Sequence, residues 1–97
     1  MSVARIGEVQ AKSELTEDLR EFLISIIPVI KSSDGCESVQ LNQSQDGPTK
    51  FLMIEIWDSV ESRQASVKNI PADKLGEIRP LLASSPSGSY YSLVQQK

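Results

Sequence analysis

Two segments in the middle of the chain, residues 36–43 and 50–57, alternate polar and apolar side chains and flank a short turn sequence. Alternation with a period of two is typical of β-strands. The intervening "SQDGPT" contains Asp46 and Gly47, which tolerate a positive φ, and Pro48, which stiffens the exit from the turn. We therefore expect an antiparallel hairpin around which the rest of the chain is arranged.

A strand and a helix are expected before this hairpin. Residues 3–11 alternate loosely, which predicts a first strand, and Ser13 or Thr16 is placed to cap a helix that follows it. Pro28 should kink or tighten the last turn of this helix, and Gly35 can adopt the left-handed conformation that ends it. Its apolar residues are spaced by three and four and form one broad stripe: Leu15, Leu19, Phe22, Leu23, Ile26, Ile27 and Ile30.

A second helix and a last strand are expected after the hairpin. Asp58, with Glu61 three residues later, matches a reciprocal capping pattern at a helix N-terminus. The sequence breaks this helix at Pro71, before a short turn through residues 75–78. A final strand is predicted from residue 89 to about residue 94.

The predicted order of elements is therefore β-α-β-β-α-β. This order indicates an α+β, ferredoxin-like fold, with a four-stranded antiparallel sheet and both helices on one face. At 97 residues the chain is expected to form one domain, over residues 1–97, with a small core. Such a domain would gain stability from a partner subunit.

The charge and the apolar runs of the sequence argue against nucleic-acid binding, secretion and a membrane span. The net charge is −3 and the basic residues are scattered, which argues against a nucleic acid as the partner. The N-terminus lacks a secretory signal pattern, and the longest apolar run is far shorter than a membrane span. We therefore expect a cytoplasmic protein with no membrane partner.

The sequence contains no histidine and a single cysteine, Cys36. Histidine is the usual general base at neutral pH and the commonest ligand for zinc and iron. The sequence also offers no carboxylate cluster that would bind a hard cation. We therefore expect neither a metal nor a cofactor, and Cys36 is expected to act as a small buried apolar residue.

The two sides of the strand at residues 50–57 differ in character. One side carries only aliphatic residues, so we expect it to face the helices; it consists of Leu52, Ile54 and Ile56. The other side would lie on the uncovered face of the sheet, and it carries Phe51, Met53, Glu55 and Trp57.

The neighbouring strand would add Ser38, Gln40 and Asn42 to this uncovered face. A surface that mixes aromatic, amide and carboxylate groups predicts half of a pocket or half of an interface. Because Tyr90 and Tyr91 are adjacent in the last strand, they must point to opposite sides, and one hydroxyl is available to the same surface.

Several of these features occur together in "PVIKSSDGCESVQLNQSQDGPTKFLMIEIWDSVES". A helix ends after proline, Gly-Cys opens a strand, Asp-x-Pro-Thr forms the hairpin, and Glu-x-Trp-x-Ser precedes the second helix. The pattern resembles the antibiotic biosynthesis monooxygenase domain family, most strongly from Pro28 to Glu61. The resemblance implies a homodimer in which the open sheet face packs against a second copy to form a dimeric α/β barrel.

The resemblance also implies chemistry. Some members of the family are cofactor-free monooxygenases that oxidise polycyclic phenols or anthrones, in which the deprotonated substrate itself passes an electron to oxygen. A dry pocket with donors to an anionic oxygen serves such chemistry. In this sequence the resemblance suggests Trp57 as a wall and Glu55 as a base. A tyrosine, Tyr90 or Tyr91, would be a donor, together with Asn42 or Gln40. The pocket residues would be Gln40, Asn42, Phe51 and Met53.

Other members of the family degrade haem, and their pattern is not matched here. They use an asparagine on the first strand, a tryptophan and a histidine, and the last two positions are occupied here by Ser66 and Gly76. The first strand of this sequence has no asparagine. Haem degradation is therefore not expected.

The same residues have alternative interpretations. Trp57 could simply pack in the core, and Glu55 could be a structural carboxylate with Arg5 as its partner. The protein would then be a non-catalytic module of the same fold that binds a small ligand or only dimerises. A cavity reached by Glu55 would favour an enzyme, whereas an interior filled by its own side chains would favour the module. An RNA-binding sheet is a third alternative, which the acidic charge disfavours.

Overall fold

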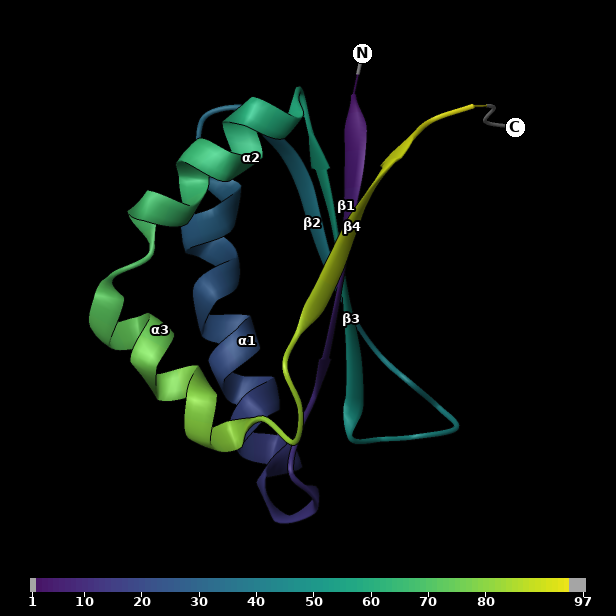
Figure 1. Ribbon diagram of the computed structural model, residues 1–97, viewed down its shortest axis with the longest axis vertical. Helices are drawn as coiled ribbons and strands as arrows, with labels where there is room; N and C mark the ends of the chain where they lie inside the picture. Colours follow the sequence, from purple (N-terminus) through teal and green to yellow (C-terminus); the bar gives the residue numbers. More distant parts are fainter. Residues whose placement is uncertain (1, 95–97) are drawn as a thin grey trace.

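The computed structural model describes residues 2–94 and consists of two layers, a β-sheet and a layer of helices on one of its faces (Figure 1). The strands are β1 (Val3–Gln10), β2 (Cys36–Gln43), β3 (Lys50–Trp57) and β4 (Ser87–Ser92). The α-helices are α1 (Thr16–Lys31), α2 (Val60–Ser66) and α3 (Ala72–Ile78). Short 3-10 turns adjoin them: η1 (Ser13–Leu15), η2 (Val67–Asn69) and η3 (Arg79–Leu81).

The four strands are arranged in the order β2-β3-β1-β4, and all neighbouring strands are antiparallel. The hairpin of β2 and β3 has the predicted bounds, and β1 lies between the hairpin and β4. This arrangement confirms the predicted ferredoxin-like fold. The segment expected to be a short turn after Pro71 is the helix α3, and the last strand begins two residues earlier than predicted.

The predicted caps of both helices are wrong. The chain enters α1 through the turn η1, and the hydroxyl of Thr16 donates to the carbonyl oxygen of Ser13 at 3.2 Å instead of capping the helix. At α2 the N-cap is Ser59, whose Oγ accepts a hydrogen bond from the backbone N–H of Ser62. The N–H of Asp58 still pairs with the carbonyl of Gly35 at 2.8 Å, and the helix begins one residue later than predicted. None of the helices in the described residues has the length and apolar character that crossing a membrane requires.

Gly35 follows α1 with a φ of 89°, the left-handed conformation predicted for it. Its position also lacks room for a side chain. A Cβ there would lie 2.6 Å from Oδ1 of Asp58 and 2.7 Å from Oγ of Ser62. Glycine therefore allows the turn after α1 to pack against the chain that leads from β3 into α2.

The core lies between α1 and the sheet. The predicted stripe of α1 supplies five buried residues: Leu19, Phe22, Leu23, Ile26 and Ile30. The sheet supplies Phe51, Met53 and Trp57 from β3, together with Ala11. Trp57 and Leu19 are fully buried.

The assignment of the two sides of β3 was therefore wrong. Phe51, Met53, Glu55 and Trp57 face the helices and are buried, whereas the aliphatic side of the strand is only half-buried on the other face. Two aromatic rings and a thioether remove more apolar surface from water than three aliphatic side chains, so the larger residues occupy the core.

We call the face of the sheet away from the helices the open face. It carries Leu52, Ile54 and Ile56 of β3, paired across β1 with Glu8, Ile6 and Ala4. On β2 the same face carries Asn42, Gln40 and Ser38, which pair with the same residues of β3. The open face thus has an aliphatic centre and a polar margin along β2.

Candidate functional site

Glu55 and Trp57 lie two residues apart on β3 and point to the same side of the sheet, towards the helices. The indole Nε1 of Trp57 donates a hydrogen bond of 2.8 Å to Oε1 of Glu55. Glu55 is only 5% exposed and Trp57 is completely buried. The carboxylate and the indole therefore form one buried polar pair within the apolar core.

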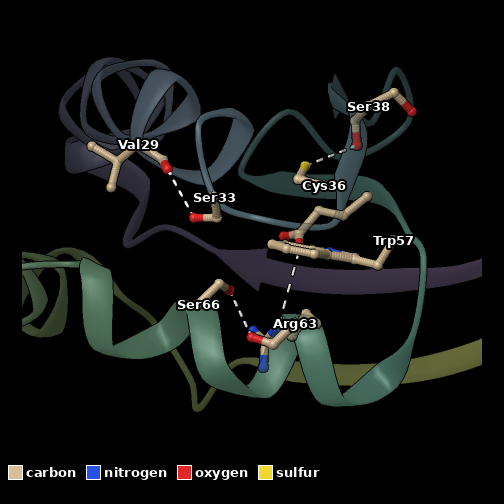
Figure 2. A network of polar contacts seen from close by, with 8 residues as sticks. Val29, Ser33, Cys36, Ser38, Trp57, Arg63 and Ser66 are labelled. Atoms are coloured by element: carbon tan, nitrogen blue, oxygen red, sulfur yellow. Dashed lines mark hydrogen bonds and ion pairs between the residues drawn. The ribbon is translucent and has the colours of Figure 1, made fainter.

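Arg63 of α2 completes this pair. Because α2 starts immediately after β3, its first turns fold back beside the end of the strand. Nε of Arg63 lies 3.9 Å from the same Oε1 of Glu55. Figure 2 shows Arg63 on one side of the indole plane of Trp57 and Cys36 on the other. We refer to Glu55, Trp57 and Arg63 as the buried triad.

Arg63, not Arg5, is thus the partner of Glu55. The sheet register does place Arg5 directly opposite Glu55, but no ion pair joins them in the part of the chain that the structure describes. The sequence does not indicate Arg63 as a partner, because its contact with Glu55 depends on the direction in which α2 leaves the strand. Removing a charged partner from a buried carboxylate is costly, so Arg63 helps to keep Glu55 in the core.

Cys36 of β2 pairs across the sheet with Trp57, and its Sγ lies 3.8 Å from the carbonyl oxygen of Ser38 (Figure 2). Burial raises the pKa of the Cys36 thiol above its ordinary value, and the negative charge of Glu55 raises it further. A raised pKa leaves little thiolate at neutral pH. Cys36 is thus half-buried and not buried as predicted, and its raised pKa does not favour a role as a nucleophile.

A small polar hollow lies beside α2, where sequence analysis identified no binding residues. It has a volume of about 250 Å³ and is lined by Asp34, Ser62, Ala65, Ser66 and Asn69. The amide of Asn69 donates to Oγ of Ser33 at 3.2 Å, which ties η2 to the turn after α1. Ser33 in turn donates to the carbonyl of Val29 (Figure 2). These contacts connect the helices to one another and do not reach the buried triad.

The two adjacent tyrosines of β4 are divided between the faces, as predicted. Tyr90 pairs with Arg5, which lies opposite Glu55, so its side chain is on the helix-facing side. Tyr91 pairs with Ala4 and is on the open face. Tyr90 is therefore the tyrosine that shares a side of the sheet with the buried triad.

Gln40 and Asn42 are not near Trp57. They lie on the open face, where the amide of Asn42 donates to Oε1 of Gln40 at 3.3 Å. The predicted site residues are thus divided between two surfaces. Phe51, Met53, Glu55, Trp57 and Tyr90 are on the helix-facing side, and Gln40, Asn42 and Tyr91 are on the open face.

One hollow is mainly apolar, with a volume of about 570 Å³. It lies at one end of the open face, against Ala4, Ile56 and Tyr91. Of the five hollows we find, none is lined by Glu55 or Trp57. Glu55 and Trp57 are enclosed by the protein's own side chains, whereas Arg63 is partly exposed.

Most of the chain matches a known family. The family model for antibiotic biosynthesis monooxygenases matches residues 2–72. The chain belongs to the antibiotic biosynthesis monooxygenase family. This confirms the resemblance seen in the sequence between the helix before the hairpin and the start of the second helix.

Solved structures from several organisms share the fold of this family member. A protein from Mycobacterium tuberculosis superposes with a TM-score of 0.85 at 19% identity, over 99% of this chain and 98% of that one. A protein of unknown function from Nitrosomonas europaea gives 0.83 at 24% identity, over 99% and 92%. A candidate antibiotic biosynthesis monooxygenase from Chloroflexus aurantiacus gives 0.75 at 25% identity, over 99% and 98%. Among curated proteins, no significant match was found.

Proposed function

We propose that this chain is a cofactor-independent monooxygenase that oxidises a small aromatic substrate of the quinol or anthrone type between the helices and the sheet. Family membership supports the proposal. The observation that carries it is the clustering of polar groups on the helix-facing side of the sheet. There the buried triad adjoins Arg5 and Tyr90, which are paired with each other across β1 and β4.

The proposed reaction needs no redox group from the protein. A bound anthrone or quinol loses a proton to solvent water, and its anion passes one electron to O2, which forms superoxide and a substrate radical. In the anthrone case these combine into a peroxide anion, which takes a proton back from solvent and loses water to give the ketone, so that anthrone and O2 become anthraquinone and water. A protein accelerates such a reaction by stabilising the substrate anion and by excluding bulk water.

The residues have different roles in this proposal. Tyr90 and Arg5 can donate hydrogen bonds to an anionic oxygen from the partly exposed region of the helix-facing side. Trp57 forms the wall behind them. Glu55 already accepts from the indole and lies beside Arg63, so we assign it to holding this wall in place and not to removing the substrate proton.

We further propose that the chain is a homodimer joined through the open face. The aliphatic residues Leu52, Ile54 and Ile56 are only half-buried there, next to Ile6 and to an apolar hollow. A contiguous apolar surface of this kind is typical of an interface. Covering it with a second copy would also supply the stability that a domain of this size needs.

Oxygen consumption tests the enzymatic proposal. Anthrone and 1,4-naphthohydroquinone are incubated with the protein, and the autoxidation rate without protein is subtracted. We expect oxygen uptake above this background, one 18O atom from 18O2 in the anthraquinone carbonyl, and a loss of at least about tenfold in the Tyr90→Phe variant. Tyr91→Phe is the matched control, since Tyr91 is on the other face and should leave the rate unchanged. Uptake that never exceeds autoxidation would contradict the proposal.

A second candidate is a non-catalytic module that binds a small ligand or only dimerises. One observation favours it: Glu55 and Trp57 are buried, and none of the five hollows described above is lined by Glu55. The two candidates differ in their response to a quinol. A module would consume no oxygen, whether or not calorimetry shows that it binds the quinol, whereas an enzyme would consume oxygen in proportion to the quinone formed.

A further inference from the structure

Arg5 lies in the middle of β1, between Glu55 of β3 and Tyr90 of β4. All three side chains are on the helix-facing side of the sheet. The next residue of β1 on that side is Gly7, and it pairs with Gly88 of β4. Two glycines therefore stand side by side next to Arg5.

The guanidinium group of Arg5 lies over these two glycines. A Cβ built on Gly7 would be 2.7 Å from Nη1 of Arg5, and a Cβ built on Gly88 would overlap the guanidinium. Contacts this short show that any side chain at either position would displace the group. Because Gly7 and Gly88 have no side chains, the planar guanidinium group packs directly against their backbone.

Within residues 2–94, Arg5 has neither a hydrogen-bond acceptor nor an ion-pair partner among the side chains. The nearest carboxylate across the sheet, that of Glu55, is used by Trp57 and Arg63 instead. Arg5 is nevertheless only partly exposed. A guanidinium that is partly removed from water gains from an anionic acceptor, and its planar donors suit an oxygen anion.

The surroundings of Arg5 are accessible from one direction. The helices pack mainly on β2 and β3, and all six residues of β4 are exposed, including Gly88 and Tyr90. In the strand order β4 is the edge strand at the opposite end of the sheet from β2. A ligand can therefore approach the guanidinium over β4, where it would meet the ring and hydroxyl of Tyr90.

We propose that Arg5, lying on Gly7 and Gly88, binds the deprotonated oxygen of a planar aromatic ligand, with Tyr90 beside it. The ligand class is a phenol or enol bound as its anion. The single cation and the neighbouring carboxylate of Glu55 favour one negative charge over a dianion such as a phosphate ester. The inference that the bound anion is a substrate rests on the proposed function. The inference that Arg5 binds such an anion does not depend on it.

The binding of 4-nitrophenol, whose anion absorbs visible light, tests this inference. Titration of the dye with pH, with and without protein, gives the affinity for the anion and the pKa of the bound phenol. We expect the protein to lower the pKa of the bound phenol, because the guanidinium stabilises the charged form. The neutral analogue 4-nitroanisole should bind at least about tenfold more weakly than the anion.

Three variants separate the role of Arg5 from a general loss of structure. Arg5→Met should weaken binding of the anion about tenfold and abolish the pKa shift, and Arg5→Lys should restore part of it. Gly88→Ala should have a similar effect to Arg5→Met, because its Cβ occupies the place of the guanidinium while the arginine remains. Gly76→Ala is the control, since its Cβ would meet nothing within 4 Å. Circular dichroism verifies that each variant is folded.

The outcomes distinguish this inference from the proposed oxidation. Arg5-dependent binding of 4-nitrophenolate without any oxygen uptake from quinols would uphold the anion site and contradict the enzyme. Oxygen uptake that is unchanged in Arg5→Met, together with equal binding of the anion by both proteins, would uphold the oxidation but overturn both the anion site and the donor role of Arg5 in that reaction. Equal affinity for 4-nitrophenolate and 4-nitroanisole would also overturn it.

Discussion

The indole N–H of Trp57 and the carboxylate of Glu55 are joined by a hydrogen bond of 2.8 Å between residues two positions apart on the same strand. The pair lies in the core, and Arg63 approaches the same carboxylate oxygen. Within the described residues, no buried side-chain nitrogen or oxygen atom lacks a hydrogen-bond partner. A glutamate can therefore occupy a core position because its strand neighbour and the following helix satisfy it.

The Trp57→Phe variant should destabilise the protein by about 2 kcal/mol or more, because Glu55 loses its hydrogen-bond donor and the core loses volume. Urea unfolding measures the loss of stability. It is followed by circular dichroism and not by fluorescence, because Trp57 is the only tryptophan and the variant lacks it. The same change made in a Glu55→Leu background should cost less, because no carboxylate is left without its donor. Strictly additive effects in this double-mutant cycle would contradict an energetic link between the two residues.

The elements of the fold were predictable because their signals are local. The alternation around Asp46-Gly47 located β2 and β3 within their observed bounds, and the spacing of apolar residues located α1. The caps failed because they depend on the path of the chain outside the helix. Asp58, for example, remains hydrogen-bonded to Gly35 as part of the sheet.

The site was only partly predictable. That Glu55 and Trp57 share a side of β3 follows from alternation, but which side faces the helices does not, since both sides are largely apolar. The neighbouring strand held the missing signal: Val39 and Leu41 lie opposite Glu55 and Met53 in the register. The partner of Glu55 could not be predicted, because Arg63 reaches it through the direction of α2, a tertiary feature.

Cys36 should react slowly with iodoacetamide, and the Glu55→Gln variant should speed the reaction at a fixed pH near 8. Burial and the charge of Glu55 raise the pKa of the thiol, so that a smaller fraction is thiolate, the reactive form. Removing the charge lowers the pKa of Cys36 towards its ordinary value and increases that fraction. Mass spectrometry of the alkylated protein over time measures the rate.

The matched control for this reaction is Glu17→Gln, which removes a charge from the exposed face of α1. Its alkylation rate should equal that of the unmodified sequence. In urea, where the core is unfolded, all three proteins should react equally. An unchanged rate in folded Glu55→Gln would show that its charge does not act on the thiol.

The Gly35→Ala variant should be less stable by about 2 kcal/mol or more, for two reasons. The φ of 89° disfavours any residue with a Cβ, and the added methyl group would press on Asp58 and Ser62. Gly76→Ala in α3 is the control with the opposite expected sign, because alanine there has open space and favours helix by roughly 0.5–1 kcal/mol. In chemical unfolding, the midpoints of the two variants should move in opposite directions. A Gly35→Ala midpoint equal to that of the unmodified sequence would show that the turn does not require glycine.

The Ile54→Glu variant should convert the proposed dimer into monomers. Ile54 lies at the centre of the aliphatic surface on the open face, between Ile6 and Gln40 in the register, and a pair of subunits would have to bury the new carboxylates without partners. Ile24→Glu is the control, since Ile24 is 44% exposed on α1, away from the open face. Sedimentation velocity over a range of protein concentrations should give a dimer for the unmodified sequence and for Ile24→Glu, and a monomer for Ile54→Glu. A monomer for the unmodified sequence at all concentrations would show that the open face is not a dimer interface, and a dimer in Ile54→Glu would place the interface elsewhere.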